Sequence, residues 1–386
     1  MSESAQPLRR RLWEVAALFL KLGTISFGGP AAHIALMETE TVRKRNWLSR
    51  EYFMDLLSAV NLVPGPNATE MAIHIGYRRA GWPGLIVGGA AFILPATLIS
   101  GALAWAYVNY GSLPQTEALF YGITPAIIAI IIAATYRLGK SALKDWKLVV
   151  LATICLIAAL LGLDQVFILP AGGLAGILLY ARPRLNGLAV LAWIAPGLPV
   201  TLPVAAFASD DRLIGLGLFF LKVGALLFGS GMVLFAFIQR DVVYRLGWLT
   251  QRQLVDAIAV GQMTPGPVLS SATFIGYLVS GWAGAVVATV AVFLPSFFIT
   301  ALLGRYLPKL RKWPLGQAFL KGINAAVVAL ILVIAIGLAR SVSWDAVAVA
   351  IVAASLFLLL RYEVETWWLV LGGAALGLIR FLLFGA

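Results

Sequence analysis

The stretch NLVPGPNATEMAIH, residues 61–74, is the most polar and least helical part of an otherwise apolar sequence. It contains two prolines separated by one glycine, and long apolar segments flank it on both sides. A proline inside a helix removes one backbone hydrogen bond and clashes with the preceding turn, which costs about 3 kcal/mol or more. The sequence therefore predicts a break in a helix at this point. The role of this break becomes clear from the rest of the sequence.

The composition indicates a helical membrane protein. Hydrophobic residues make up 61% of the 386 residues, charged residues make up 12%, and the mean hydropathy is +0.92. Apolar runs of about twenty residues, the length that crosses a bilayer, recur along the whole chain. The alternating pattern of a membrane β-barrel is absent. We therefore predict an all-α polytopic membrane protein.

The charged residues and the cysteine count exclude several other classes. The net charge of +12 comes from basic residues in short loops, which is the ordinary orientation signal of a membrane protein and no sign of nucleic-acid binding. With one cysteine and two histidines we expect no intrachain disulfide, no metal site and no cofactor.

Without a Walker motif, ATP is not expected to be the direct energy source. The polar residues 1–11 do not resemble a signal peptide, so we expect the first apolar segment to insert by itself.

The chain contains two copies of one unit. The stretch LKLGTISFGGP from Leu20 is similar to LKVGALLFGSG from Leu221, and NLVPGPN is similar to QMTPGPV 201 positions later. Chance does not give matches in such a constant register. We predict an N-terminal transporter repeat over residues 1–185 and a C-terminal repeat over residues 211–386. The linker between them, residues 186–210, is predicted to be an additional, unpaired membrane span.

The two repeats are predicted to have opposite orientations in the membrane. Arg78 and Arg79 follow the second apolar segment of the first repeat, whereas Val279 and Ser280 take this place in the second. A loop that is positively charged in one repeat is matched by a loop with little positive charge in the other repeat. The positive-inside rule therefore predicts opposite orientations for the two repeats. Many secondary transporters are built in this way, with the substrate site near the midplane where the repeats meet. The expected segments are approximately 12–38, 51–78, 83–108, 117–137, 147–163 and 165–181, then 212–238, 252–279, 283–304, 317–339, 345–360 and 366–384.

Helix breaks occur at matching positions in both repeats. Residues 64–66 and 265–267 both read Pro-Gly-Pro, and residues 27–30 and 228–231 are both rich in glycine. A break creates the N-terminus of a second half-helix, whose free N–H groups and dipole bind anions. Such a break at membrane depth must be shielded by protein or line a wet cavity. The first two segments of each repeat are then either re-entrant hairpins or full spans. The N–H groups nearest the Pro-Gly-Pro breaks belong to Asn67, Ala68 and Thr69 and to Val268, Leu269 and Ser270.

Two lysines are candidates for binding the anion. Lys21 and Lys222 each lie ten residues after an arginine and six residues before a glycine-rich break. Ten helical residues span about 15 Å, half of a hydrocarbon core of roughly 30 Å, so neither lysine easily reaches the membrane surface. We predict that they supply positive charge facing the anion. The alternatives are a shallow hairpin in which they reach the surface, or a structural ion pair.

Other polar residues near the breaks have two interpretations each. Glu70 and His74 lie four residues apart, hence on one helix face, and form either a proton relay or a structural pair. His33 follows a glycine-rich break. It is either a site residue or, as is more common for a buried histidine, a packed side chain whose ring nitrogens are hydrogen-bonded. Asn61 and Gln262 are matched amides that either cap the breaks or contact the solute.

Three motifs recur at matched positions in the two repeats: FGGP from Phe27 with FGSG from Phe228, Pro-Gly-Pro from Pro64 and Pro265, and IGY-x3-GW-x-G from Ile75 and Ile275. With these motifs, nearly the whole chain resembles the chromate ion transporter family in its long, two-repeat form. The resemblance implies a bacterial inner-membrane protein that exports chromate and gives chromate resistance. It also implies that shorter, one-repeat members work in pairs. The glycine and proline motifs of the family carry over to Gly28, Gly29, Pro64, Gly65, Pro66, Gly229, Pro265, Gly266 and Pro267, with Ser230 in place of the second glycine.

Several other functions compete with chromate export. Sulfate is a tetrahedral dianion similar to chromate, so it is a possible competitor, and a proton-coupled importer of sulfate or another oxyanion is the main alternative. A membrane-embedded lipid enzyme would need a cluster of catalytic residues near one interface, which the sequence lacks. A purely structural subunit would not explain the duplicated breaks and lysines. The sequence leaves a homodimer open.

Overall fold

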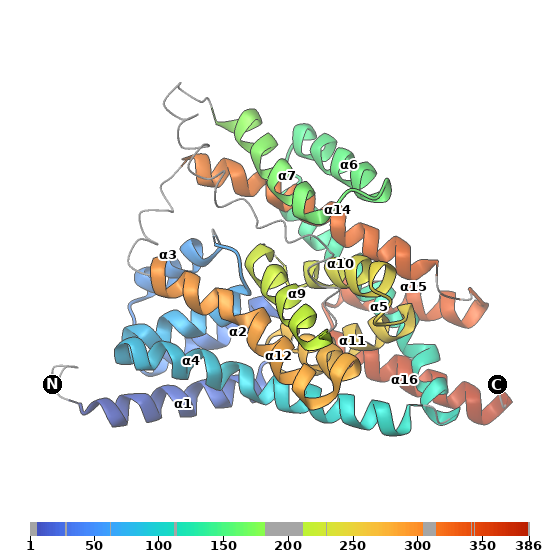
Figure 1. The fold of residues 1–386 in the computed structure, drawn as a ribbon, viewed down its shortest axis with the longest axis horizontal. Coiled ribbons are helices and arrows are strands. Elements are labelled where there is room, and N and C mark those ends of the chain that lie inside the picture. Colours follow the sequence, from blue (N-terminus) through green and yellow to red (C-terminus); the bar gives the residue numbers. More distant parts are fainter. Residues whose placement is uncertain are drawn as a thin grey trace.

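The computed structural model describes residues 6–27, 29–61, 63–111, 114–181, 211–228, 230–303, 314–340, 342 and 344–384, without the side chains of residues 114–117, 303 and 384. All regular structure in these ranges is helical (Figure 1), which confirms the predicted all-α fold. The linker 186–210, Gly28 and Gly229 lie outside the described residues, so the predicted additional span stays a prediction.

The helices of the two repeats follow one another in the same order, except that the start of α4 (Asn67–Tyr110) is matched by a separate short helix, η6 (Val268–Ser270), in the second repeat. The N-terminal repeat contains α1 (Leu8–Ile25), α2 (Pro30–Glu38) with its π-helical continuation η2 (Thr39–Lys44), α3 (Arg50–Val60), α4 (Asn67–Tyr110), α5 (Pro114–Ala142), α6 (Trp146–Leu160) and α7 (Gln165–Tyr180). The C-terminal repeat contains α9 (Arg212–Leu226), α10 (Val233–Phe237) with η5 (Ile238–Arg245), α11 (Gln251–Met263), η6 (Val268–Ser270), α12 (Ser271–Leu303), α14 (Pro314–Ala339), α15 (Ala346–Arg361) and α16 (Thr366–Phe384). Among the described residues, α4, α5, α12, α14 and α16 are long and apolar enough to cross a membrane.

The first two apolar segments of the N-terminal repeat are re-entrant hairpins. The Arg79 guanidinium lies 2.7 Å from the Glu14 carboxylate and 5.1 Å from the ring centre of Trp47. Arg11 donates a hydrogen bond of 3.2 Å to the Arg79 carbonyl. The start of α1, the residues after η2 and the end of the first part of α4 therefore meet at one end of the molecule. Each segment enters at that end, breaks, and returns to it.

A sharp turn divides α4 into two packed helices. Ala80 and Gly81 are non-helical, and Gly81 has a φ of +67°, which glycine adopts without strain. The two parts then run back along each other so closely that a Cβ added at Gly76 would lie 2.2 Å from the Gly84 carbonyl oxygen. In α12 the same turn occurs at Ser280 and at Gly281, whose φ is +61°. The IGY-x3-GW-x-G motif therefore encodes this tight helical hairpin.

The two repeats interleave and have inverted directions, as predicted. Helix α5 packs against α15 and α16 of the other repeat, and α14 packs against α6 and α7. The Lys321 ammonium, near the start of α14, lies 4.6 Å from the ring centre of Tyr180. The Tyr180 hydroxyl in turn donates to Asp145, which precedes α6 and closely follows the end of α5. The start of α14 and the end of its repeat mate α5 thus lie at the same end of the molecule.

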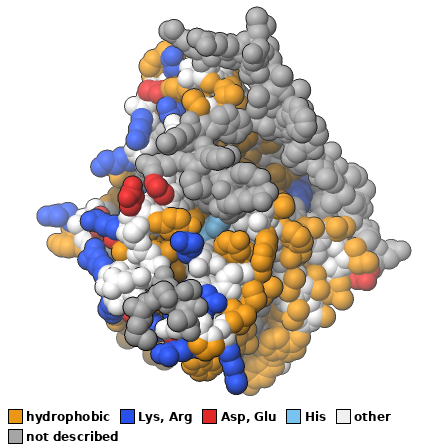
Figure 2. Space-filling view, turned by 90° about the vertical axis from the view of Figure 1, so that its left-hand side faces the viewer, with side chains coloured by type: hydrophobic (Ala, Val, Ile, Leu, Met, Phe, Trp, Pro, Cys, Tyr) orange, Lys and Arg blue, Asp and Glu red, His pale blue; other side chains and the backbone are white. Residues whose placement is uncertain are grey.

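The basic residues mark one end of the molecule as the expected cytoplasmic face. Lys and Arg side chains gather over part of the face that holds the start of α1 (Figure 2). Helix α7 ends and α14 begins on the left of Figure 1, the side that holds the start of α1. The end of α5, with Lys140 and Lys144, lies beside them by the contacts given above. The positive-inside rule places such an end in the cytoplasm. We refer to it as the inner face and to the opposite end as the outer face.

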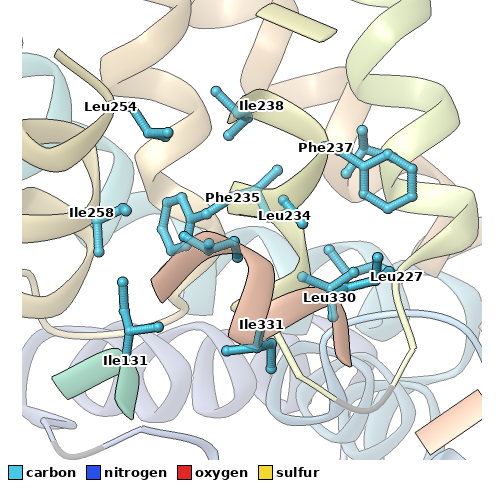
Figure 3. Packing of buried hydrophobic residues seen from close by; sticks show 14 of the residues in the cluster. Ile131, Leu227, Leu234, Phe235, Phe237, Ile238, Leu254, Ile258, Leu330 and Ile331 are labelled. Atoms are coloured by element: carbon cyan, nitrogen blue, oxygen red, sulfur yellow. The ribbon is translucent and has the colours of Figure 1, made fainter. Parts of the chain in front are cut away.

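The centre of the core is formed by the second repeat. Leu234, Phe235 and Phe237 of α10 are fully buried (Figure 3). They pack with buried side chains of α11 and α14 and with Ile131 of α5. In the first repeat, α2 has the sequence PAAHIALME and buries only His33 and Met37. The two half-helices after the glycine-rich breaks are therefore unequal: α10 is embedded, whereas α2 is partly exposed.

Small residues at the helix crossings predict one sensitive position on α5. A Cβ added at Gly122 would lie 1.8 Å from the Gly373 carbonyl oxygen, whereas one added at Gly139 of the same helix would meet nothing nearer than 3.8 Å. We expect Gly122→Ala to cause severe loss of folded protein, because the backbones of α5 and α16 would have to separate. We expect Gly139→Ala to be neutral or to stabilise by up to about 1 kcal/mol. Thermal unfolding of the detergent-purified protein measures both; equal melting temperatures would contradict the packing described.

Candidate functional site

A cavity of about 230 Å³ lies where the helix breaks of the two repeats meet. We call it the central cavity. It has room for a small anion with several water molecules. The breaks contribute Gly29, Pro30, Gly65, Pro66, Ser230, Gly231 and Pro267, and the following helical turns contribute Asn67, Ala68, Val268 and Leu269. His33, Ile130, Ala133, Ala134, Arg137, Met232, Gln262, Leu359 and Thr366 complete the lining.

Two reciprocal backbone hydrogen bonds join the breaks across the repeats. The Gly65 N–H donates to the Leu227 carbonyl over 2.6 Å, and the Gly266 N–H donates to the Ser26 carbonyl over 2.9 Å. Gly65 and Gly266 are repeat mates, and so are Ser26 and Leu227, because each pair is 201 positions apart. Each Pro-Gly-Pro break is therefore held by the glycine-rich break of the other repeat, and the site is formed by both repeats together.

The N-terminus of α4 presents backbone N–H groups without an intrahelical partner to the central cavity. Pro66 occupies the N-cap position, and α4 has no side-chain cap. The first intrahelical bond runs from the Glu70 N–H to the Pro66 carbonyl over 3.0 Å, which leaves the N–H groups of Asn67 and Ala68 without a helical partner. Both residues line the central cavity. The positive end of the α4 dipole therefore faces the cavity, which is an arrangement that favours an anion.

Arg137 adds a full positive charge to this lining. It lies near the inner end of α5, and one of its guanidinium nitrogens donates to the Leu359 carbonyl at the end of α15 over 2.5 Å. It is an exposed residue of α5, and it is the charged side chain in the described lining. Arg137 was not predicted as a site residue from the sequence, because its approach to the cavity depends on how α5 packs against α15.

The matched amides lie at the edge of the central cavity in different ways. Gln262 lines the cavity and its amide lies 3.6 Å from the Met232 sulfur. Asn61 instead accepts a hydrogen bond of 2.6 Å from the side chain of Asn67. His33 lines the cavity too; one ring nitrogen lies 3.1 Å from the Ser26 carbonyl oxygen, and its ring contacts Phe92 edge to face. His33 is thus a packed histidine with one satisfied nitrogen.

The two lysines do not line the central cavity. Lys21 forms an ion pair of 3.0 Å with Glu40, and half of its side chain is exposed. Lys222 forms an ion pair of 2.9 Å with Asp241, and both side chains are buried. In this geometry neither lysine presents charge to the cavity, and the structural ion pair left open in the sequence analysis is the arrangement found. The physical reason is that the carboxylates on η2 and η5 fold back over α1 and α9.

Glu40 and Asp241 were not predicted from the sequence as partners of the lysines, although the sequence contains a signal for this pairing. They lie 201 positions apart, as Lys21 and Lys222 do. Glu40 also contacts Lys44 and Arg45, at 3.1 and 3.5 Å. The hydrogen bond from Lys21 is the main cause that lowers the pKa of the Glu40 carboxyl to about 2.

Several other predicted site residues lie behind the cavity wall. Pro64, Pro265 and Gly266 belong to the breaks but do not line the cavity. Ser270 is fully buried, and its hydroxyl lies 3.2 Å from the Thr264 hydroxyl, so it stabilises the break instead of facing the cavity.

Glu70 and His74 are also buried outside the cavity lining. The Glu70 carboxylate lies against Gly65, where an added Cβ would be 2.2 Å from one carboxylate oxygen and 2.8 Å from the Ser296 hydroxyl. Within the described part of the chain, neither carboxylate oxygen of Glu70 has a hydrogen-bond partner, so no bond joins it to His74. The side chains do not form the predicted pair in this conformation. The same part of the chain contains no group of three residues able to hold a metal ion.

This duplicated architecture is that of a known family. The family described as chromate transporter matches residues 13–177 and again residues 214–378. The chain belongs to the chromate transporter family. Each match lies within one of the two repeats, and the protein is accordingly a multi-pass membrane protein of a transporter family, as the sequence predicted.

Named relatives cover most of the chain. It is 35% identical over 374 residues to the chromate transport protein of Cupriavidus metallidurans, covering 96% of this chain and 93% of that protein. It is 36% identical over 340 residues to the chromate transport protein of Pseudomonas aeruginosa, covering 85% and 81%. The uncharacterized transporter YwrA of Bacillus subtilis is 29% identical over 126 residues, covering 33% of this chain but 71% of that shorter protein. No solved structure matches.

The two lysine ion pairs predict unequal effects on stability. We expect Lys222→Gln to destabilise the fold by about 3–5 kcal/mol, because it leaves the buried Asp241 carboxylate without its nearest cation. We expect Lys21→Gln to cost only about 0–1 kcal/mol, because its pair is half exposed. Thermal unfolding in detergent measures both effects. The double variant Lys222→Gln/Asp241→Asn should recover much of the loss; failure to do so would contradict the ion-pair explanation.

Proposed function

We propose that this protein is a secondary transporter that exports chromate from the cytoplasm and thereby gives chromate resistance. Family membership and the names of the full-length relatives support chromate as the substrate. The observation that carries the proposal is the central cavity, in which the N-terminus of α4 and the Arg137 guanidinium face the same space. A cationic side chain and the free N–H groups of a helix N-terminus, which lack an intrahelical partner, are the donors that a small dianion needs.

The composition of the cavity lining supports reversible binding of an oxyanion. Asn67, Gln262 and Ser230 supply neutral polar groups, and the rest of the wall is mostly apolar. One full positive charge plus a helix dipole, equivalent to roughly half a charge, does not fully neutralise a dianion. Such a site binds an oxyanion but releases it again, which transport requires.

Membrane energetics favour the outward direction. An inside-negative potential is worth about 2.3 kcal/mol per charge per 100 mV, so a leaving dianion gains roughly 4.6 kcal/mol at 100 mV. Export therefore needs no further driving force, whereas import would need several co-transported cations. A proton gradient could add to the potential.

One observation keeps proton-coupled import of sulfate or another oxyanion as the second candidate. Glu70 is almost completely buried beside the Gly65 break, and no described residue hydrogen-bonds to its carboxylate. A buried carboxyl without a partner is a place where a proton can be carried, because burial penalises the charged form. An importer of this kind would lose its pH dependence in Glu70→Gln, whereas a potential-driven exporter would not.

The test is uptake of labelled chromate into everted membrane vesicles with an imposed potential. Everted vesicles present the cytoplasmic face outward, so an exporter accumulates chromate inside. We expect Arg137→Gln to lower the initial uptake rate at subsaturating chromate by about tenfold or more, because a charged hydrogen-bond donor is lost. Lys140→Gln is the matched control, since this residue is exposed on the same helix three positions later and should leave uptake unchanged.

Excess sulfate in the same assay reports selectivity. Uptake in everted vesicles that sulfate reduces would indicate a transporter of tetrahedral dianions with weak discrimination. Absence of uptake above protein-free vesicles, with the protein inserted in the membrane, would overturn export. Uptake only into right-side-out vesicles would favour the importer.

A further inference from the structure

A second cavity, of about 380 Å³, lies away from the central cavity. We call it the outer cavity. It is enclosed by the end of α14, the loop between α6 and α7, and the half-helix formed by α10 and η5. Its polar lining includes Gln165, Gln239, Arg240, Arg245 and Arg340.

The outer cavity is built partly from the repeat mates of the central cavity. The α14 residue Gly337 corresponds to Arg137 of α5, and Ala159 of α6 corresponds to Leu359 of α15, each 200 positions apart. Gln165 and Thr366 occupy the first positions of the matched helices α7 and α16. Because the repeats are inverted, two surfaces related in this way face opposite sides of the membrane.

The contacts of the helices support this position. Helix α14 starts at the inner face, beside Tyr180 and Asp145, and after 26 residues it ends beside Arg340. Helix α6 leaves the same face at Asp145 and spans about 22 Å before its loop. In that loop, the carbonyls of Gly162 and Leu163 accept hydrogen bonds from Arg240. The outer cavity therefore opens at the face opposite the N-terminal arginines.

Positive charge dominates the surroundings of the outer cavity. Arg240 and Arg245 lie 4.0 and 3.0 Å from Asp164, and Arg245 also lies 3.5 Å from Asp241, which pairs with Lys222. With Arg340, four cations stand against two carboxylates in this group. The excess of positive charge attracts anions to this face and not cations.

A buried amide also points to a ligand. Gln239 is 3% exposed, lines the outer cavity, and its side-chain nitrogen has no hydrogen-bond partner among the described residues. An unsatisfied buried donor costs about 1–3 kcal/mol, so a partner for it is expected. Its amide lies against Gly337, where an added Cβ would be 2.4 Å from the nitrogen. The repeat mate of Gln239 is the acidic Glu38, so a neutral donor is found only in the second repeat.

We propose that the outer cavity is a second oxyanion-binding site, occupied by a tetrahedral dianion after it leaves the central cavity. This inference rests on the proposed function, because it assigns the same substrate class to the exit side. Gln239 and Arg340 are the residues that contact the anion, while Arg240 and Arg245 hold the wall in place through Asp164 and the α6–α7 loop. The site also explains why arginines gather at the outer face, where the positive-inside rule disfavours them.

The test is protection of an introduced cysteine. Tyr244 lines the outer cavity and is 65% exposed, and the native Cys155 is buried and can be replaced by serine. In Cys155→Ser/Tyr244→Cys, a membrane-impermeant thiosulfonate is added to right-side-out vesicles, and the rate of labelling is measured with increasing sulfate. Sulfate is used because chromate would oxidise the thiol. The control cysteine is Trp344→Cys, exposed near the start of α15 at the same face.

We expect sulfate to slow labelling of the Tyr244→Cys protein several-fold and to leave the Trp344→Cys protein unaffected, with chloride at equal ionic strength inactive. Arg340→Gln and Gln239→Leu should each raise the sulfate concentration for half protection by about tenfold. Equal labelling with and without sulfate, or unchanged protection in both variants, would overturn the proposal. Protection reports equilibrium binding and needs no transport, so its failure is distinguishable from failure of chromate uptake in the parent protein.

Discussion

The backbone hydrogen bonds between Gly65 and Leu227 and between Gly266 and Ser26 are the constraint on which the fold depends. In hydrocarbon, every backbone N–H and C=O needs a partner, and a helix break removes several partners at once. Here each repeat satisfies the break of the other. The central cavity is therefore a property of the pair of repeats. The shorter relative YwrA matches only 33% of this chain, less than one such pair of repeats.

Close backbone contact is the second condition for this arrangement. Gly76 against Gly84, and Gly122 against Gly373, bring helices together without intervening side chains. Between apolar helices in lipid, such contact is what replaces the hydrophobic effect as a source of association. The resulting interleaving of α5 with α15 and α16, and of α14 with α6 and α7, makes the scaffold around the breaks continuous across both repeats.

The charges near the breaks divide into two classes. Lys21 and Lys222 are neutralised by carboxylates on the following π-helices and serve the packing of each hairpin. Arg137 and the α4 N-terminus remain directed at the central cavity. The repeats are not equivalent in this respect, because the mate of Arg137 is Gly337 and the mate of Glu38 is Gln239. The two inverted repeats therefore place unequal charges at the central cavity and at the outer cavity.

The sequence was sufficient to predict the helical membrane class, the duplication, the inverted repeats and the positions of the breaks. These follow from local properties: apolar length, loop charge, and the inability of Pro-Gly-Pro to continue a helix. It did not determine the partners of the lysines, since an ion pair depends on how η2 and η5 fold back over α1 and α9. It missed Arg137, whose approach to the cavity depends on the packing of α5 against α15. Which of the break residues line the cavity, and which, like Ser270, lie behind it, was also decided by the tertiary structure, because helix rotation about the breaks is set by contacts between the repeats.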